Sequence, residues 1–221
     1  MSPRFAFNNM SAFNGNPIAP LMVGSIRRHM PDSRIIQLSD SFGEQTPGVD
    51  RLVKYDFKYD EKTYPQVWFQ LMYSVYSSEG IGAGGIVCCD ADMIFMGDIS
   101  PLLDDEYDIA ICRRFDDNTG ILYRIFHPYN IGFMIIKNPD IVACCSNIIS
   151  LSKYNNTFSS LGQHIIGLVV NSGEFKVKFL DGAIYNRTPK NIDDYDENVK
   201  VWHFKGDRKD WRVDWTKRHH V

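Results

Sequence analysis

The chain has 221 residues and a mass of 25.4 kDa, which is enough for one domain with a substantial hydrophobic core. Hydrophobic residues make up 44% of it and charged residues 23%, so its composition excludes an intrinsically disordered chain. Lys and Arg number 24 against 27 Asp and Glu, and the resulting net charge of -3 excludes a globally basic nucleic-acid-binding protein. We predict a single domain that spans residues 1–221.

The first half of the chain alternates predicted strands with predicted helices. Short apolar runs bounded by turn residues predict strands at residues 5–8, 34–38, 51–55 and 86–89. Apolar stripes at helical spacing predict helices at residues 17–30, where Pro31 ends the pattern, and at residues 64–79. Such alternation is typical of an α/β domain with a largely parallel sheet.

The second half alternates less regularly. Strands are predicted at residues 107–112, 130–136, 176–180 and 199–203, and helices at residues 139–154 and 163–171. We therefore expect one continuous domain in which the second half completes a ligand site that the first half begins.

Cysteine usage and the absence of long apolar runs predict a cytoplasmic location. The five cysteines include two adjacent pairs and no C-x-x-C unit, which favours small buried thiols in a reducing compartment. No apolar run approaches the roughly 18 residues that a membrane-spanning helix needs. No signal peptide is indicated after the first four residues.

The most informative segment is an acidic pair that directly follows the apolar run at residues 86–89. Asp90 and Asp92 are separated by one small residue, and positions with this spacing project to the same side of an extended chain. Two neighbouring carboxylates at the end of a buried strand repel each other unless a cation lies between them. Solvated loops also carry such pairs, but the apolar residues 93–96 that follow favour a position near the core. The pair therefore predicts a site for Mg²⁺ or Mn²⁺ at the carboxyl edge of the sheet.

Residues 86–103 resemble the Asp-x-Asp segment of the GT-A fold glycosyltransferases, especially glycosyltransferase family 8. Residues 129–136 resemble the Asn-x-Gly strand of that family, and residues 201–211 match its spacing H-x-x-G-x-x-K-x-W. The resemblance implies an α/β GT-A fold, a Rossmann-like mixed sheet flanked by helices that binds nucleotide-diphospho-sugars. It also implies an enzyme that transfers a hexose from such a donor.

The resemblance implies a role for each matching residue around the metal. Asp90, Asp92 and His203 would hold Mn²⁺, or Mg²⁺, on the diphosphate of a uridine diphosphate (UDP) sugar. The backbone of Gly206 would approach that diphosphate, and Lys209 would neutralise it. These roles agree with the residues themselves, since a neutral imidazole is a competent metal ligand and Lys is a point charge suited to a leaving diphosphate.

The resemblance also implies the residues that contact the sugar and the nucleotide. Asn130 and Gly132 would lie beneath the donor sugar, and Gln163 would offer its amide to the sugar or its anomeric face. We therefore count Gln163, Lys209 and Asn130 as the catalytic candidates. The base and ribose would lie over the ends of the first two strands, at Phe7, Asn8 and Asp40. UDP-glucose or UDP-galactose is the implied donor.

Three features depart from the family pattern. Asp210 stands where the family usually has Pro, which bears on the rigidity of that loop. The acids that normally flank the position of Gln163 are absent. No Lys or Arg lies between Lys62 and Asp90, so a contact that the family makes from there must be absent or supplied by another segment.

The implied reaction is transfer with retention, in which catalysis consists mainly of stabilising negative charge on the leaving diphosphate. An inverting enzyme would need a general base, which the sequence does not place. The acceptor is expected to be a glycan, a glycolipid or a protein. The basic residues within 205–221 are either a solvated tail or an attraction for an anionic acceptor, which keeps modified DNA as an alternative.

Three other functions compete with this interpretation. A sugar nucleotidyltransferase would begin with a Gly-rich loop, whereas residues 1–20 contain one glycine, Gly15. A binding protein that keeps the nucleotide-sugar site without turnover agrees with the altered surroundings of Gln163. A metal-dependent nuclease or phosphatase would want more acids at converging strand ends than this chain supplies.

Overall fold

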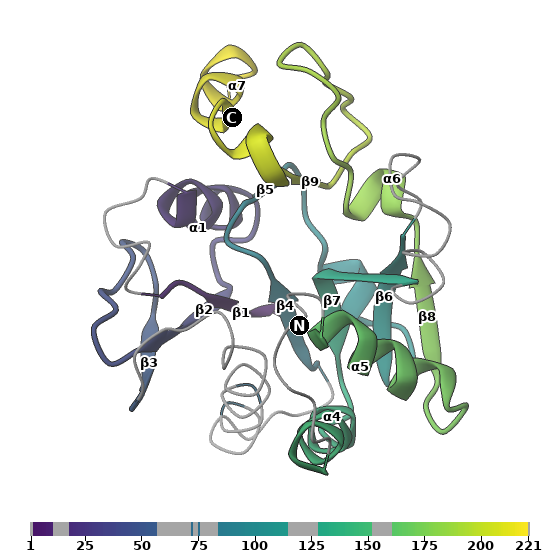
Figure 1. Ribbon diagram of the computed structural model, residues 1–221. Helices are drawn as coiled ribbons and strands as arrows, with labels where there is room; N and C mark the ends of the chain where they lie inside the picture. The colour runs from purple at the N-terminus through teal and green to yellow at the C-terminus, as the bar shows by residue number, and fades with distance from the viewer. Residues whose placement is uncertain are drawn as a thin grey trace.

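The computed structural model describes residues 2–10, 18–56, 72, 75, 84–114, 128–151 and 161–220. Within these residues, seven strands form the main sheet in the order β3-β2-β1-β4-β7-β6-β8 (Figure 1). β7 is antiparallel to its neighbours β4 and β6, and all other neighbouring strands pair in parallel. The strands are β1 Arg4–Asn8, β2 Arg34–Asp40, β3 Arg51–Tyr55, β4 Ile86–Cys89, β6 Ile109–Arg113, β7 Tyr129–Ile136 and β8 Val177–Leu180.

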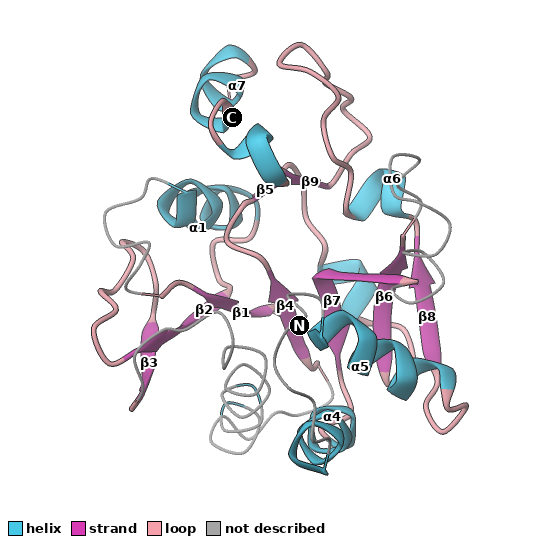
Figure 2. Ribbon diagram, viewed as in Figure 1, coloured by secondary structure: helices cyan, strands magenta, loops and turns pink. Residues whose placement is uncertain are grey.

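Both faces of this sheet are covered, because each central strand sends alternate apolar side chains to opposite sides. On β4, Ile86 and Cys88 belong to one core cluster, while Val87 and Cys89 belong to the other. The first cluster includes residues of α4 Asp140–Leu151 and α5 Leu161–Asn171, and the second includes α1 Ile18–His29 (Figure 2). Burial on both faces explains why these strands appear in the sequence as continuous apolar runs.

A second, two-stranded sheet lies across the carboxyl edge of the main sheet. β5 Met93–Phe95 pairs antiparallel with β9 Val201–His203, and Met93 lies opposite His203 (Figure 1). The C-terminal helix α7 Arg212–Arg218 packs on this sheet through a third core cluster that contains Ile94, Trp202, Phe204 and Trp215. Three short elements complete the described part: the 3-10 helices η2 Ser100–Leu103 and η3 Gly206–Lys209, and the helix α6 Gly182–Tyr185.

Most predicted elements are confirmed to within a few residues. Two short elements near the site were not predicted: residues 93–95 form β5, and residues 212–218 form α7. Both are too short to show a period of their own. Of the helix predicted at residues 64–79, Met72 and Val75 are helical and buried, and the remainder lies outside the described residues.

No helix in the described ranges combines the length and the apolar character that a membrane crossing requires.

Candidate metal centre and its surroundings

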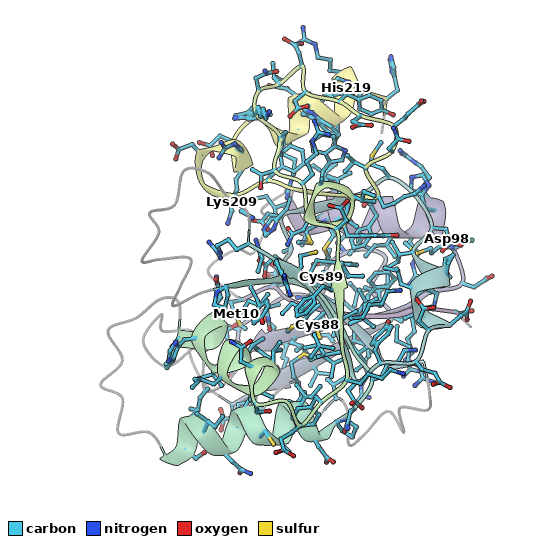
Figure 3. The ribbon with its side chains drawn as sticks, turned by 90° about the vertical axis from the view of Figure 1, so that its right-hand side faces the viewer. Met10, Cys88, Cys89, Asp98, Lys209 and His219 are labelled. Carbon is cyan, nitrogen blue, oxygen red and sulfur yellow. The ribbon has the colours of Figure 1, made fainter. Side chains whose placement is uncertain are left out.

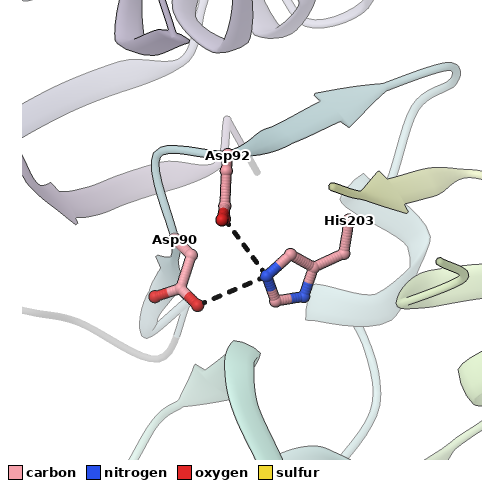
Figure 4. A group of neighbouring side chains, drawn as sticks. All are labelled: Asp90, Asp92 and His203. Carbon is pink, nitrogen blue, oxygen red and sulfur yellow. Dashed lines mark ion pairs between the residues drawn. The ribbon is translucent and has the colours of Figure 1, made fainter. Parts of the chain in front are cut away.

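Two strands of the small sheet bring the acidic pair and a distant histidine together. Asp90 follows β4, and its backbone N–H donates to the Gly132 carbonyl on β7 at 2.8 Å. Asp92 directly precedes β5, and its carbonyl accepts from the N–H of Phe204 at 2.9 Å. Because β5 pairs with β9, His203 lies beside both carboxylates, although it follows Asp92 by 111 residues in the sequence. Figure 4 shows the three side chains pointing toward one another.

The imidazole of His203 is oriented with one nitrogen toward the two carboxylates. Its Nε2 lies 3.1 Å from Asp92 Oδ1 and 3.5 Å from Asp90 Oδ2 (Figure 4). Its Nδ1 lies 2.8 Å from Asn186 Oδ1, and because a carboxamide oxygen only accepts, Nδ1 carries the hydrogen. Nε2 therefore faces both carboxylates, a position from which it could share a cation with them.

The two aspartates differ in their pKa. Burial alone would raise the pKa of Asp92, but the charges and hydrogen bonds of His203 and Lys209 hold it well below the usual value. At Asp90, desolvation followed by repulsion from Asp92 raises the pKa, against the attraction of His203 and Lys209. One carboxylate is thus firmly ionised, and its neighbour gains most from an added positive charge.

The donor set fits a divalent metal ion. One ligand atom each from Asp90, Asp92 and His203 can be chosen so that all three lie within 4.8 Å of one another. Two carboxylate oxygens and one imidazole nitrogen suit Mn²⁺ or Mg²⁺ with further oxygen ligands. Asn186 supplies the outer contact that orients the histidine, as metal-bound histidines generally require.

Gly132 keeps this centre open from the side of β7. A Cβ at this position would lie 2.4 Å from His203 Cε1 and 2.7 Å from Asp90 Oδ2, so a side chain here would displace a candidate ligand. The Oδ1 of Asn130, which is buried, accepts from the Gly132 N–H at 2.9 Å. The predicted Asn-x-Gly strand therefore lies directly against the candidate metal centre.

Lys209 and Gly206 lie at the same edge, on η3. Lys209 Nζ is 2.9 Å from Asp92 Oδ2, and its side chain is 46% exposed, so the ammonium borders both the carboxylate and solvent. Figure 3 shows Lys209 beside the C-terminal segment, with Cys88 and Cys89 of β4 deeper in the molecule. Gly206 has a φ of +58°, and a Cβ there would meet nothing within 4 Å. Its backbone conformation, and not lack of space, favours glycine.

Sequence reasoning missed two residues beside the centre. Asn186, which orients His203, carries no local motif. Arg212 was counted in a possible solvated tail, and for this residue that expectation is wrong, because it is fully buried on α7. Its Nη1 donates to the Ala91 carbonyl at 3.4 Å, and burial lowers the pKa of its guanidinium to about 10, against the attraction of Asp92. Arg212 therefore keeps a positive charge behind the turn that carries both aspartates.

The remaining predicted residues lie on both sides of this centre. Gln163, at the start of α5, accepts through Oε1 a hydrogen bond from Arg114 Nη2. On the other side, the Phe7 side chain is buried in the core, so only its backbone is available to a ligand. Asn8 ends β1, and its buried Oδ1 has no hydrogen-bond partner among the described residues. Asp40 ends β2 and is fully buried.

The sheet order, with one antiparallel strand beside β4 and an acidic pair at the ligand-binding edge, defines the GT-A fold of the glycosyltransferases. Comparison with solved structures places the chain in this fold class. No protein-family model and no curated protein sequence matches the chain.

Three solved structures illustrate the likeness. The galactosyltransferase LgtC, in complex with donor and acceptor sugar analogs, is 16% identical, with a TM-score of 0.58 over 96% of this chain and 91% of LgtC. The glycosyltransferase GlyE of Streptococcus pneumoniae TIGR4 is 15% identical, with a TM-score of 0.60 over 100% of this chain and 61% of GlyE. The bifunctional glycosyltransferase WbbM is 15% identical, with a TM-score of 0.60 over 100% of this chain and 52% of WbbM.

Proposed function

We propose that this chain is a metal-dependent glycosyltransferase that moves a hexose from UDP-glucose or UDP-galactose to an acceptor hydroxyl with retention. The observation that carries the proposal is the convergence of Asp90, Asp92 and His203, with ligand atoms within 4.8 Å of one another, at the carboxyl edge of a GT-A sheet. The acceptor hydroxyl would belong to a glycan, a glycolipid or a protein.

The three converging residues would hold Mn²⁺ or Mg²⁺ through two carboxylate oxygens and the Nε2 of His203. When bound, such an ion supplies positive charge that offsets the negative charge developing on a leaving diphosphate. Lys209, whose ammonium contacts Asp92, adds a second positive charge at the same place. The positive φ of Gly206 turns the chain before Lys209, and without a Cβ its backbone can approach the phosphate oxygens closely.

We propose retention because residues 86–103, 129–136 and 201–211 resemble a retaining family. Asp90 and Asp92 face His203, so we assign both to the metal and neither to nucleophilic attack on the sugar. The acceptor oxygen would then attack from the side on which the diphosphate leaves. Asn130, through its contact with Gly132, would maintain the floor beneath the sugar, and Gln163, held by Arg114, would present its amide N–H group.

The nucleotide would extend from the metal over the ends of β1 and β2. Strand β1 is the direct neighbour of β4, with Phe7 opposite Cys89, and the free Oδ1 of Asn8 suits a donor group of the base or ribose. Asp40 lies one strand further from the metal, and because its side chain is fully buried, a contact with a ribose hydroxyl would require this side chain to become accessible.

The experiment is a panel of UDP-sugars with Mn²⁺, in which UDP release and melting temperature are both measured. We expect UDP-glucose or UDP-galactose to raise the melting temperature only with metal present, and we expect EDTA to abolish UDP release. Asp92→Asn should lower turnover about 100-fold or more while circular dichroism stays unchanged. Asp104→Asn, which alters an exposed acid outside the cluster, is the matched control.

Two of the competing functions predict different outcomes of this experiment. UDP release that EDTA does not diminish would contradict the proposal. Donor binding without any release would identify a binding protein, and pyrophosphate formed from UTP and a sugar phosphate would identify a nucleotidyltransferase.

A further inference from the structure

The side chain of Arg212 lies in an apolar part of the molecule. It is fully buried at the start of α7, and its guanidinium carbon lies 6.0 Å from the ring centroid of Phe204. The buried members of the core cluster to which this ring belongs are Ile94, Val199, Trp202, Phe204 and Trp215. Burying a charge in such surroundings is costly unless the charge is paired and hydrogen-bonded.

The hydrogen bonds of this guanidinium are incomplete. The bond from its Nη1 to the Ala91 carbonyl is long, at 3.4 Å. Its Nε and Nη2 are buried and have no hydrogen-bond partner in the described part of the chain. With a pKa of about 10, the group is nevertheless charged at neutral pH. An apolar side chain of similar length would cost the fold less, so packing does not account for an arginine at this position.

The charge of Arg212 acts on Asp92 from behind the turn that joins the two aspartates. The attraction of Asp92 opposes the effect of burial on the pKa of Arg212, which shows that the two charges interact. Ala91, whose carbonyl Arg212 contacts, stands between Asp90 and Asp92 in the sequence. Because its hydrogen bond goes to the backbone, Arg212 offsets part of the negative charge of Asp92 without a contact to the carboxylate.

Lys209 contacts the same carboxylate from the solvent side. Its Nζ lies 2.9 Å from Asp92 Oδ2, and its side chain is 46% exposed, whereas that of Asp92 is 9% exposed. Under the proposed function, Lys209 also has to neutralise a diphosphate, which the attraction of Asp92 opposes. A second positive charge behind Asp92 weakens that attraction.

We propose that Arg212 is a positioning residue of the diphosphate site, which offsets the charge of Asp92 so that Lys209 is available to the diphosphate; this inference rests on the proposed function. The two cations divide the work by their exposure, since Arg212 is buried behind the turn and Lys209 borders solvent. The segment before the aspartates adds no positive charge, because no Lys or Arg lies between Lys62 and Asp90. The C-terminal segment supplies both cations instead.

The test compares Arg212→Met with the wild type by titration calorimetry, with UDP at saturating Mn²⁺ and with Mn²⁺ alone. Methionine is unbranched and apolar, so the substitution removes the charge and keeps the position filled. We expect the affinity for UDP to fall about tenfold, because Asp92 then holds Lys209 more firmly. The affinity for Mn²⁺ alone should be unchanged or higher, because a repelling charge near the ion is gone.

The melting temperature gives a second readout, in which a merely structural role has the opposite sign. Arg212→Met should melt at the same temperature as the wild type or at a higher one, since a buried charge is removed from an apolar cluster. A lower melting temperature together with weaker binding of both UDP and Mn²⁺ would overturn the inference, because Arg212 would then only support the fold. Unchanged affinity for UDP would overturn it too.

A double-mutant cycle tests whether Arg212 acts through Lys209. In a Lys209→Met background, Arg212→Met should lower the affinity for UDP by less than about threefold, since the residue that it makes available is absent. A tenfold loss in that background would overturn the assigned route. Lys217→Met, at a side chain that is 75% exposed on the same helix, is the matched control and should leave all three measurements unchanged.

The inference and the proposed function can be told apart when they fail. A wild type that binds UDP with Mn²⁺, and an Arg212→Met variant that binds it equally well, would contradict the inference and leave the proposed function standing. A wild type that does not bind UDP with Mn²⁺ would contradict the proposed function, and the role of Arg212 would fall with it.

Discussion

Gly132 shows how strictly the site restricts a single position. The space beside it is filled by the edge of the His203 ring and by an Asp90 oxygen, at 2.4 and 2.7 Å from the place a Cβ would take. Neither group is the far end of a flexible side chain, since the ring is held by Asn186 and Asp90 is short.

Gly132→Ala should therefore lower the affinity for Mn²⁺ in the presence of UDP by more than about tenfold, which a change in a closely supporting contact generally causes. Titration calorimetry measures the change. Gly24→Ala is the matched control, because a Cβ there meets nothing within 4 Å and alanine is favoured in helix α1 by about 1 kcal/mol. Wild-type affinity in Gly132→Ala would contradict the assigned geometry.

The contribution of Asp50 to the stability of the fold depends on pH. Its Oδ2 accepts from the Ile35 N–H and from Arg27 Nη2, each at 2.6 Å. Partial burial raises its pKa, but these two partners outweigh burial and lower it. Because the pKa is lower in the folded than in the unfolded chain, the stabilisation is complete above the ordinary value of about 3.9 and is lost as the pH falls through the folded pKa.

Asp50→Asn should reduce the free energy of unfolding by less than about 1 kcal/mol at pH 7, because its side chain is 44% exposed and solvent screens the ion pair, and the difference should shrink below a pH of about 4. Urea unfolding at pH 7 and at acid pH tests this, with Asp32→Asn as an exposed control nearby. A difference that stays constant with pH would show that the carboxylate charge is not its cause.

At the scale of elements, α7 is a structural part of the site. Trp215 is fully buried, its ring centroid lies 5.2 Å from that of Phe204 and 5.3 Å from that of Trp202, and its Nε1 donates to the Asp194 carbonyl. The same helix places Arg212 under Ala91. Helix α7 thereby braces β5 and β9, the two strands that position Asp92 and His203.

Trp215→Ala should lower the free energy of unfolding by about 3–5 kcal/mol, the usual cost of emptying a buried aromatic site. It should also weaken Mn²⁺ binding, because the support of β9 loosens. Urea unfolding and metal titration measure the two effects. Leu168→Ala on α5, where the side chain is 48% exposed, is the control and should cost less than about 1 kcal/mol. If Trp215→Ala also lowered the free energy of unfolding by less than about 1 kcal/mol, α7 would not support β5 and β9.

At the scale of the whole molecule, the reactivity of the cysteine thiols measures how often the core unfolds. Cys88 and Cys89 on β4, Cys112 on β6 and Cys145 on α4 are buried, and Cys144 is partly exposed. Burial raises the pKa of the Cys112 thiol to about 12 and raises those of the other three buried thiols well above the ordinary value. Since the thiolate is the reactive form, these four should react only when the core opens.

A thiol reagent in native buffer should therefore modify one cysteine quickly, and the other four at a rate that follows unfolding. Counting the released chromophore over time measures both phases, and Cys144→Ser should remove the fast one. Two or more rapidly reacting thiols would mean that the core opens locally far more often than its packing suggests.

The sequence predicted the features that depend on residues close to one another in the chain. Strands buried on both faces appear as apolar runs, and Asp90 and Asp92 stand two residues apart at the end of one of them, so the acidic pair and its place at the sheet edge could be recognised. His203, Gly206 and Lys209 were found through the spacing of a known motif, because no physical signal within those residues links them to β4.

Only the tertiary structure decided which distant segments meet. β5 is three residues long and pairs with β9 across more than a hundred residues, and this pairing places His203 beside the aspartates. Asn186 behind the imidazole and Arg212 under Ala91 both depend on contacts of this kind. A local pattern in the sequence indicates which side chains are buried and which are charged. It does not indicate which distant residues they contact, because long-range packing determines those contacts.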